Sequence, residues 1–392
     1  MLDLRVLWFA LILGLAACAG SDTTEPPAPL VDFQAEARFT KLWDIDTGSG
    51  SDKYLLKLKA YLQGDQLYVV DHDGLLSAIN RQTGKRLWKV DTGLAVSAGV
   101  AGGGGMLILG SSNGEIAAYN QKDGSRAWKA RLSSVMLSVP AVDMGTVIAR
   151  TVDGSLEAFA VTTGAKLWSY KYSVPALSLH GTSSPVLVAG AVLSGMDNGR
   201  LSALAVRDGR LLWEAPVAIP GGRSELSRMV DIDMPVLVDR GLLYSGSYQG
   251  RIVALSLEGG QIVWATNNSV YNEMSLDEEH LYVADENGHI WSLERLVGAT
   301  VWMQDKLHAR PVSGTALLGR AVLVGDFEGY IHAMDTSDGR FVARYRAGEA
   351  GINVPPLIAD NTVYVLSRDG LLTALQLDYF TAPANAADQV KN

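Results

Sequence analysis

Residues 73–88 read DGLLSAINRQTGKRLW, and this pattern returns along the whole chain. Its first glycine recurs in steps of 38 to 51 residues, at Gly74, Gly114, Gly154, Gly199, Gly250, Gly288, Gly329 and Gly370. A second glycine follows ten residues after each of the first seven. A tryptophan follows four residues later in six of the seven repeats, and the seventh has Ala343.

A period near 40 residues with β-rich content between turns is typical of β-propellers, in which each repeat forms one four-stranded blade. The Asp-Gly and Asn-Gly pairs supply the positive φ angles that tight hairpin turns require. We expect the recurring tryptophan to pack between neighbouring blades. A row of tryptophans that stacks on a ligand is the rival interpretation.

The two ends of the repeat region complement each other. The eighth hairpin, around Gly370, has no tryptophan strand after it, whereas residues 41–48 (KLWDIDTG) form such a strand without a hairpin and resemble 86–93 (RLWKVDTG). Pairing the N-terminal strand with the last blade would cover strand edges that otherwise invite aggregation. The sequence therefore predicts an all-β fold over 37–380, an eight-bladed propeller of four-stranded antiparallel blades closed by the N-terminal strand. Residues 381–392 are small and polar, and we expect a disordered tail.

The N-terminus has the features of an export signal. Residues 1–17 contain Arg5 and a short apolar run, and Leu-Ala-Ala precedes Cys18, the only cysteine. This is the lipobox pattern of bacterial lipoproteins, which predicts a lipidated Cys18 followed by a flexible tether over 18–36. Because Ala19 and not aspartate follows, the pattern favours the periplasmic face of the outer membrane. An ordinary signal peptide, or a buried free thiol, is the alternative.

Composition and motifs exclude several classes of function. With 33 basic and 42 acidic residues, the net charge of −9 argues against binding to nucleic acid or to an anionic membrane surface. The six histidines show no metal-ligand spacing, and no nucleophile elbow or phosphate-binding loop occurs. We therefore expect no enzyme activity, no cofactor and no metal, and contact with the membrane only through the lipid anchor.

Two segments depart from the repeat and account for its two longest steps. They are residues 175–185 (PALSLHGTSSP) and 222–233 (GRSELSRMVDID). Because a blade needs only short turns, extra residues form loops on one rim, where binding is common. The insertions belong to consecutive blades, so they should lie side by side.

The residue pattern of the insertions suggests protein docking. Leu177 and Leu179 alternate and would point the same way, as would Asp231 and Asp233, with Arg228 able to orient the carboxylates. Apolar area beside charge suits a protein-docking patch. Alternatively, the leucines pack under their own loop and the aspartates cap turns.

The repeat resembles that of the pyrroloquinoline-quinone dehydrogenases, which are also eight-bladed. Many of these enzymes have an adjacent cysteine pair beside the quinone, and this chain has one cysteine in total. The resemblance therefore covers the scaffold and not the site. A quinone-dependent enzyme is kept as an alternative function.

The lipobox, the eight repeats and the two insertions together resemble the BamB family, the propeller lipoproteins of the outer-membrane β-barrel assembly (BAM) machinery. The resemblance implies a non-enzymatic scaffold that binds the periplasmic POTRA domains of BamA and assists β-barrel insertion. Unfolded barrel proteins are a further candidate partner, which strand edges or loops of the propeller could contact.

The same resemblance assigns apolar contact to Leu177 and Leu179 and polar or supporting roles to Asp231 and Asp233. His180 stands where well-studied relatives have arginine, so a constant positive charge is absent there. A generic periplasmic interaction propeller is the remaining alternative.

Overall fold

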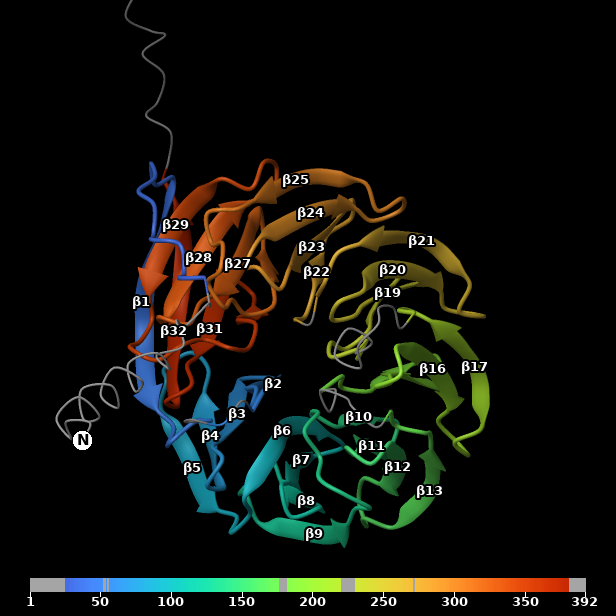
Figure 1. Ribbon diagram of the computed structural model, residues 1–392. Coiled ribbons are helices and arrows are strands. Elements are labelled where there is room, and N and C mark those ends of the chain that lie inside the picture. Colours follow the sequence, from blue (N-terminus) through green and yellow to red (C-terminus); the bar gives the residue numbers. More distant parts are fainter. Residues whose placement is uncertain are drawn as a thin grey trace, which may run out of the picture.

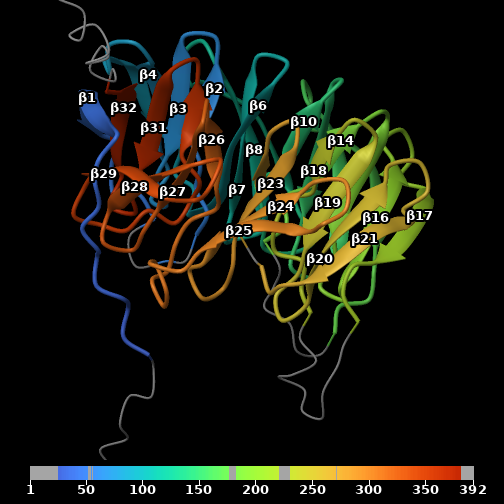
Figure 2. The same cartoon turned by 90° about the horizontal axis from the view of Figure 1, so that it is seen from above.

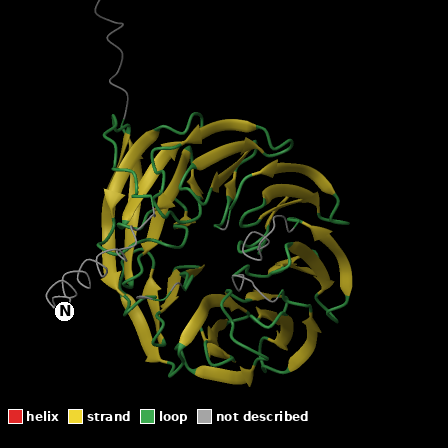
Figure 3. Ribbon diagram, viewed as in Figure 1, coloured by secondary structure: helices red, strands yellow, loops and turns green. Residues whose placement is uncertain are grey.

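The computed structural model describes residues 25–51, 54, 56–175, 182–219, 230–270 and 272–380. Eight four-stranded antiparallel sheets stand in a ring around a central axis (Figure 1). Every regular element in these residues is a strand (Figure 3), and none of them forms a helix long and apolar enough to cross a membrane. The prediction of an all-β, eight-bladed propeller is confirmed.

Each blade runs from an inner strand near the centre of the ring to an outer strand at the perimeter (Figure 1). From the inside outwards, the strands of blades 1 to 3 are β2 (Tyr61–Gln63), β3 (Gln66–Val70), β4 (Leu75–Asn80) and β5 (Arg86–Asp91); β6 (Val96–Gly103), β7 (Met106–Ser111), β8 (Glu115–Asn120) and β9 (Arg126–Arg131); and β10 (Ala141–Asp143), β11 (Thr146–Arg150), β12 (Ser155–Ala160) and β13 (Lys166–Lys171). Those of blades 4 to 6 are β14 (Val186–Val188), β15 (Ala191–Gly195), β16 (Arg200–Ala205) and β17 (Leu211–Pro216); β18 (Leu237–Asp239), β19 (Leu242–Gly246), β20 (Arg251–Ser256) and β21 (Ile262–Asn267); and β22 (Ser275–Leu276), β23 (His280–Ala284), β24 (Ile290–Glu294) and β25 (Thr300–Gln304). Those of blades 7 and 8 are β26 (Ala316–Leu318), β27 (Ala321–Gly325), β28 (Tyr330–Asp335) and β29 (Phe341–Arg346); and β30 (Leu357–Ala359), β31 (Thr362–Leu366), β32 (Leu371–Tyr379) and β1 (Ala37–Asp46).

Blade 8 closes the ring as expected. Strand β1 pairs antiparallel with β32, in a register that sets Ala37 opposite Tyr379 and Asp46 opposite Leu371. The N-terminal strand is thus the outer strand of the last blade, and the ladder joins the two ends of the repeat region.

The repeated tryptophans bind each blade to the next. The indole Nε1 of Trp88 in blade 1 donates to the carbonyl of Gln121 in blade 2, at 3.2 Å. Its ring lies against Gly124, where an added Cβ would come within 2.7 Å of the ring. The same pair of contacts recurs at Trp43, Trp128, Trp168, Trp213, Trp264 and Trp302. The predicted packing between blades is confirmed.

The missing tryptophan at Ala343 has a structural cause. In every other blade the tryptophan docks on the turn between strands three and four of the next blade. In blade 8 these two strands are β32 and β1, which lie at opposite ends of the described chain, so no such turn joins them. Ala343 is 2% exposed, and the adjacent Val342 carbonyl instead accepts the Glu36 amide, at 3.0 Å.

Residues 25–36 are docked on the propeller, which differs from the expected flexible tether. The Ala28 amide donates to the His308 carbonyl at 2.9 Å, and the Arg310 guanidinium donates to the Ala28 carbonyl at 3.0 Å. Phe33 packs on Phe341 with ring centroids 5.6 Å apart. Burial of apolar side chains together with backbone hydrogen bonds holds this segment in place.

The up-and-down order of the strands gives the ring two different faces. One face carries the connections from the outer strand of a blade to the inner strand of the next, together with the turns between strands two and three. We call it the connection face; the opposite face carries the remaining turns. Figure 2 shows the blades from the side, packed around the ring. Both insertions belong to the connection face, because they join β13 to β14 and β17 to β18.

Candidate functional site

The described ends of the two insertions are bonded to each other. The Thr182 amide donates to Oδ1 of Asp233, and the Thr182 hydroxyl donates to the Asp233 carbonyl, both at 3.2 Å. One residue further on, the Ser183 hydroxyl donates to the Met234 carbonyl at 2.8 Å. The expectation that the insertions lie side by side is confirmed at these ends.

Five of the predicted site residues lie outside the described part of the chain. They are Cys18, Leu177, Leu179, His180 and Arg228. Their predicted roles therefore stay predictions, and the described part of the site consists of Asp231, Asp233 and their neighbours.

Asp231 and Asp233 are buried, with 0% and 8% of their surfaces exposed. Burial raises the pKa of Asp233, against the opposing influence of Lys57 and of the Thr182 amide. The carbonyl of Asp231 accepts the Tyr248 amide at 3.2 Å. Of the two roles considered for these aspartates, this geometry favours support of the loops over direct contact with a partner.

The residues between and after the aspartates anchor the second insertion. Ile232 and Met234 are completely buried, and an added Cβ at Gly195 would come within 2.3 Å of Ile232. The lack of a side chain at Gly195 therefore makes room for Ile232 beside blade 4. This packing fixes the C-terminal end of the second insertion in position.

A buried polar network supports the first insertion, and sequence reasoning missed it. The Arg150 guanidinium pairs with Asp197, and the Tyr172 hydroxyl accepts from Arg150 and donates to Asp197, both at 3.0 Å. Tyr172 directly follows β13, where the connection to blade 4 begins, and burial raises its pKa to about 12. The available signal was Arg150 itself, because glycine occupies the matching repeat position at Gly110 and Gly195.

The described residues contain no group of three or more His, Cys, Asp and Glu side chains placed to hold a metal ion. Two histidines do meet, since Nε2 of His289 lies 2.9 Å from Nδ1 of His308. Their outer nitrogens lie 3.1 Å from carboxylate oxygens of Asp285 and Glu25, so these rings link blade 6 to the docked N-terminal segment.

Comparison with known proteins shows the family to which the chain is similar. A family model described as outer membrane protein assembly factor BamB matches residues 72–304 and 297–379. BamB from Pseudomonas aeruginosa is 44% identical over 366 residues, which is 93% of this chain and 96% of the relative. BamB from Alkalilimnicola ehrlichii is 45% identical over 94% of this chain and 95% of its own.

Solved structures give the same fold. The crystal structure of BamB from Moraxella catarrhalis superposes with a TM-score of 0.79 at 22% identity, over 86% of this chain and 99% of its own. A quinohemoprotein alcohol dehydrogenase from Comamonas testosteroni reaches a TM-score of 0.70 at 14% identity, over 88% of this chain and 78% of its own, which shows likeness of fold alone. With the family model and the full-length relatives in agreement, the chain belongs to the BamB family of outer membrane protein assembly factors.

Proposed function

We propose that this chain is a non-enzymatic scaffold that binds the periplasmic POTRA domains of BamA and holds them in an orientation productive for β-barrel insertion. The observation that carries the proposal is the pair of insertions, bonded at their bases and standing together on the connection face. A rigid ring that presents two adjacent loops is suited to hold another protein, and loops on such scaffolds commonly carry binding.

The residues of the insertions divide into contact and support. Leu177 and Leu179 supply apolar area that a partner would cover, and His180 offers a hydrogen bond at their edge. Asp233 acts from below, because its carboxylate holds the Thr182 amide that ends the first insertion. Loss of this carboxylate would remove the bond to the Thr182 amide, while the two bonds to the backbone carbonyls of Asp233 and Met234 would stay.

The proposal also places the protein at the periplasmic face of the outer membrane, anchored by lipid on Cys18. Six residues lie between Cys18 and Glu25, and the seven residue-to-residue steps of an extended chain span at most about 25 Å. Because residues 25–36 are docked, this short segment alone sets the distance between membrane and propeller. The ring is then held close to the membrane, where barrel insertion takes place.

Titration of the soluble Cys18→Ser form, residues 18–392, against purified POTRA domains of BamA tests this function. We expect saturable binding that Leu179→Ala weakens about tenfold, or about 1.4 kcal/mol. Leu87→Ala is the matched control, because Leu87 is a 46% exposed leucine on the outer strand of blade 1. It should bind like the wild type.

Asp233→Ala adds a test of the supporting role, with folding of each variant checked by circular dichroism. We expect weaker binding because the Thr182 amide loses its acceptor. Wild-type affinity in both Leu179→Ala and Asp233→Ala would move the interface elsewhere. Absence of binding between properly folded proteins would refute the proposed function.

A further inference from the structure

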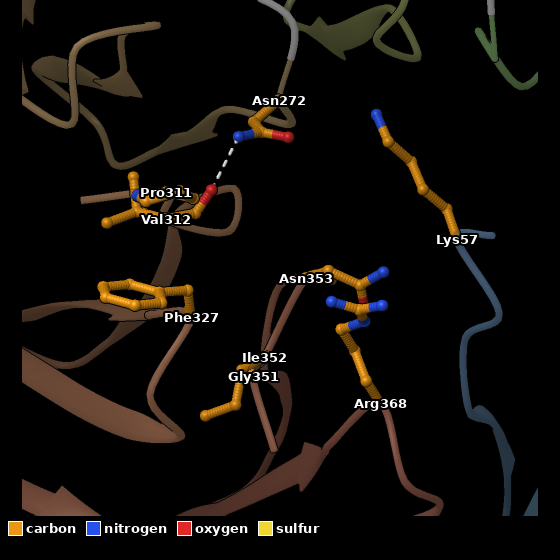
Figure 4. A pocket seen from close by; sticks show the side chains of 9 residues that line it. All are labelled: Lys57, Asn272, Pro311, Val312, Phe327, Gly351, Ile352, Asn353 and Arg368. Atoms are coloured by element: carbon orange, nitrogen blue, oxygen red, sulfur yellow. Dashed lines mark hydrogen bonds between the residues drawn. The ribbon is translucent and has the colours of Figure 1, made fainter. Parts of the chain in front are cut away.

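A cavity of about 360 Å³ opens on the connection face, on the side of the ring formed by blades 6, 7 and 8. Figure 4 shows its nine lining residues, which come from connections and from turns of that face. The volume falls in the range of sites that hold small ligands. Neither the insertions nor the repeat pattern accounts for this cavity.

Most of its wall is apolar and fixed in position. Val312 and Ile352 are buried to 6% and 2% exposure, and the ring of Phe327, which is 39% exposed, stands beside them (Figure 4). The Arg310 guanidinium lies 4.8 Å from the centroid of this ring, and it is itself paired with Asp326. An apolar group in the cavity would therefore meet a preformed surface.

The opposite side of the cavity is cationic. Lys57 and Arg368 are both half-buried lining residues, and the lining residues that the structure describes include no carboxylate. Burial lowers the pKa of Lys57, because the loss of hydration outweighs the attraction of Asp233 and Glu273. An anion bound beside Lys57 would favour its charged form and so raise this pKa.

Two carboxamides complete the polar side. The Asn353 side chain donates to the Leu56 carbonyl at 3.0 Å, and the Asn272 side chain donates to the Val312 carbonyl at 2.8 Å. These bonds fix the orientation of both amides, with the amide oxygens as the remaining acceptors. The cavity thus offers cations and acceptors on one side and an apolar wall on the other.

We infer that this cavity binds a carboxylate carried on an apolar group, of the kind found at the C-terminal residue of a polypeptide or in a small aromatic acid. The charge of Lys57 and the planar donor fork of Arg368 match a carboxylate, and Phe327 matches an aromatic or aliphatic side chain. The apolar wall disfavours a free phosphate, which has no apolar part to bury.

The inference goes beyond the scaffold function and does not require it. The ligand is titrated into the propeller alone, with no POTRA domain present. A failure would leave the proposed binding of BamA untouched, and the reverse also holds.

Calorimetric titration of N-acetyl-phenylalanine into the soluble Cys18→Ser form tests the inference. We expect saturable binding at one site, and binding at least about tenfold weaker for the corresponding amide, which has no charge. Lys57→Met and Arg368→Gln should each weaken binding by about the same factor. Lys122→Met is the control, because this exposed lysine lies in a turn of the opposite face.

Peptides distinguish the two sources of the carboxylate. A pentapeptide that ends in phenylalanine with a free carboxylate should bind at least as tightly as N-acetyl-phenylalanine if the cavity accepts a chain terminus. If N-acetyl-phenylalanine binds more tightly than the pentapeptide, the inference is supported and the site is assigned to small acids. Equal binding of acid and amide would overturn the inference, and so would competition by inorganic phosphate. It would also be overturned if a folded variant, Lys57→Met or Arg368→Gln, bound the acid with wild-type affinity.

Discussion

Replacing Gly124 with alanine tests how much of the stability of the ring depends on the docking of each tryptophan onto the next blade. Gly124 has a φ angle of 73°, and an added Cβ would lie 2.7 Å from Cζ3 of Trp88 and 2.8 Å from Cγ2 of Val90. Gly93 is the matched control, because its φ angle is 66° and an added Cβ meets nothing within 4 Å.

Both substitutions force an alanine into left-handed backbone, which costs about 1 kcal/mol. Gly124→Ala must also displace the indole of Trp88, and such overpacking costs about 1–3 kcal/mol more. We therefore expect Gly93→Ala to lower the free energy of unfolding by about 1 kcal/mol and Gly124→Ala by about 2–4 kcal/mol.

Urea denaturation followed by far-UV circular dichroism and by tryptophan fluorescence measures both values. Coincidence of the two transitions checks that unfolding is two-state. If the two variants differ by less than about 0.5 kcal/mol, the docking contact contributes little and the reasoning is wrong.

Three further substitutions probe the buried polar groups. Trp128→Phe removes the indole donor that lies 2.7 Å from the Val161 carbonyl and should cost about 1–2 kcal/mol in urea denaturation; an unchanged midpoint would contradict the role of this bond. Arg150→Met removes the guanidinium that pairs with Asp197 in the interior and should cost about 3–5 kcal/mol in urea denaturation; a cost below about 1 kcal/mol would contradict the role of this ion pair. Burial lowers the pKa of His332 below 6.5. The stability that the neutral ring contributes is therefore present above pH 6.5 and is lost as the pH falls below that value. Between pH 6.5 and 5, thermal unfolding should show a smaller loss of stability for His332→Gln than for the wild type.

The fold could be predicted from the sequence because the same local chemistry is repeated eight times. A turn glycine marks all eight repeats, a second turn glycine follows in seven of them and a tryptophan in six, and the unmatched strand around Trp43 predicts how the ring closes. A departure from the pattern in one repeat does not change the predicted fold, because the other repeats still show the pattern. The absence of tryptophan at Ala343 is the informative exception, and it became clear only with the three-dimensional arrangement of blade 8.

The candidate site was predicted less completely. Alternation indicates that Asp231 and Asp233 share a side, but it does not indicate whether a neighbouring blade covers that side. The structure places both in the interior because Ile232 and Met234 anchor the segment. Burial depends on contacts between distant parts of the chain, and the local pattern contains no record of them.

The docked N-terminal segment was missed for a related reason. Residues 25–36 are rich in proline, and such composition is common in linkers. Leu30 and Phe33 nevertheless pack against the cluster between blades 6 and 7, and the Arg344 guanidinium donates to a backbone carbonyl of the segment at 2.9 Å. The composition of the segment does not reveal this docking, because the arginines that hold the segment lie some 300 residues further along the chain.

The pairing of β1 with β32 also sets an order in time. Thr40 and Asp378, which are hydrogen-bonded neighbours across this ladder, are 338 residues apart in sequence. A chain that appears N-terminus first, on the far side of a membrane as at the ribosome, presents β1 before the other strands and β32 after them. Inner blades can form from neighbouring segments as they appear, whereas β1 stays unpaired until the last strand has appeared. The strand that seals the finished ring is therefore the one most exposed to mispairing before the chain is complete.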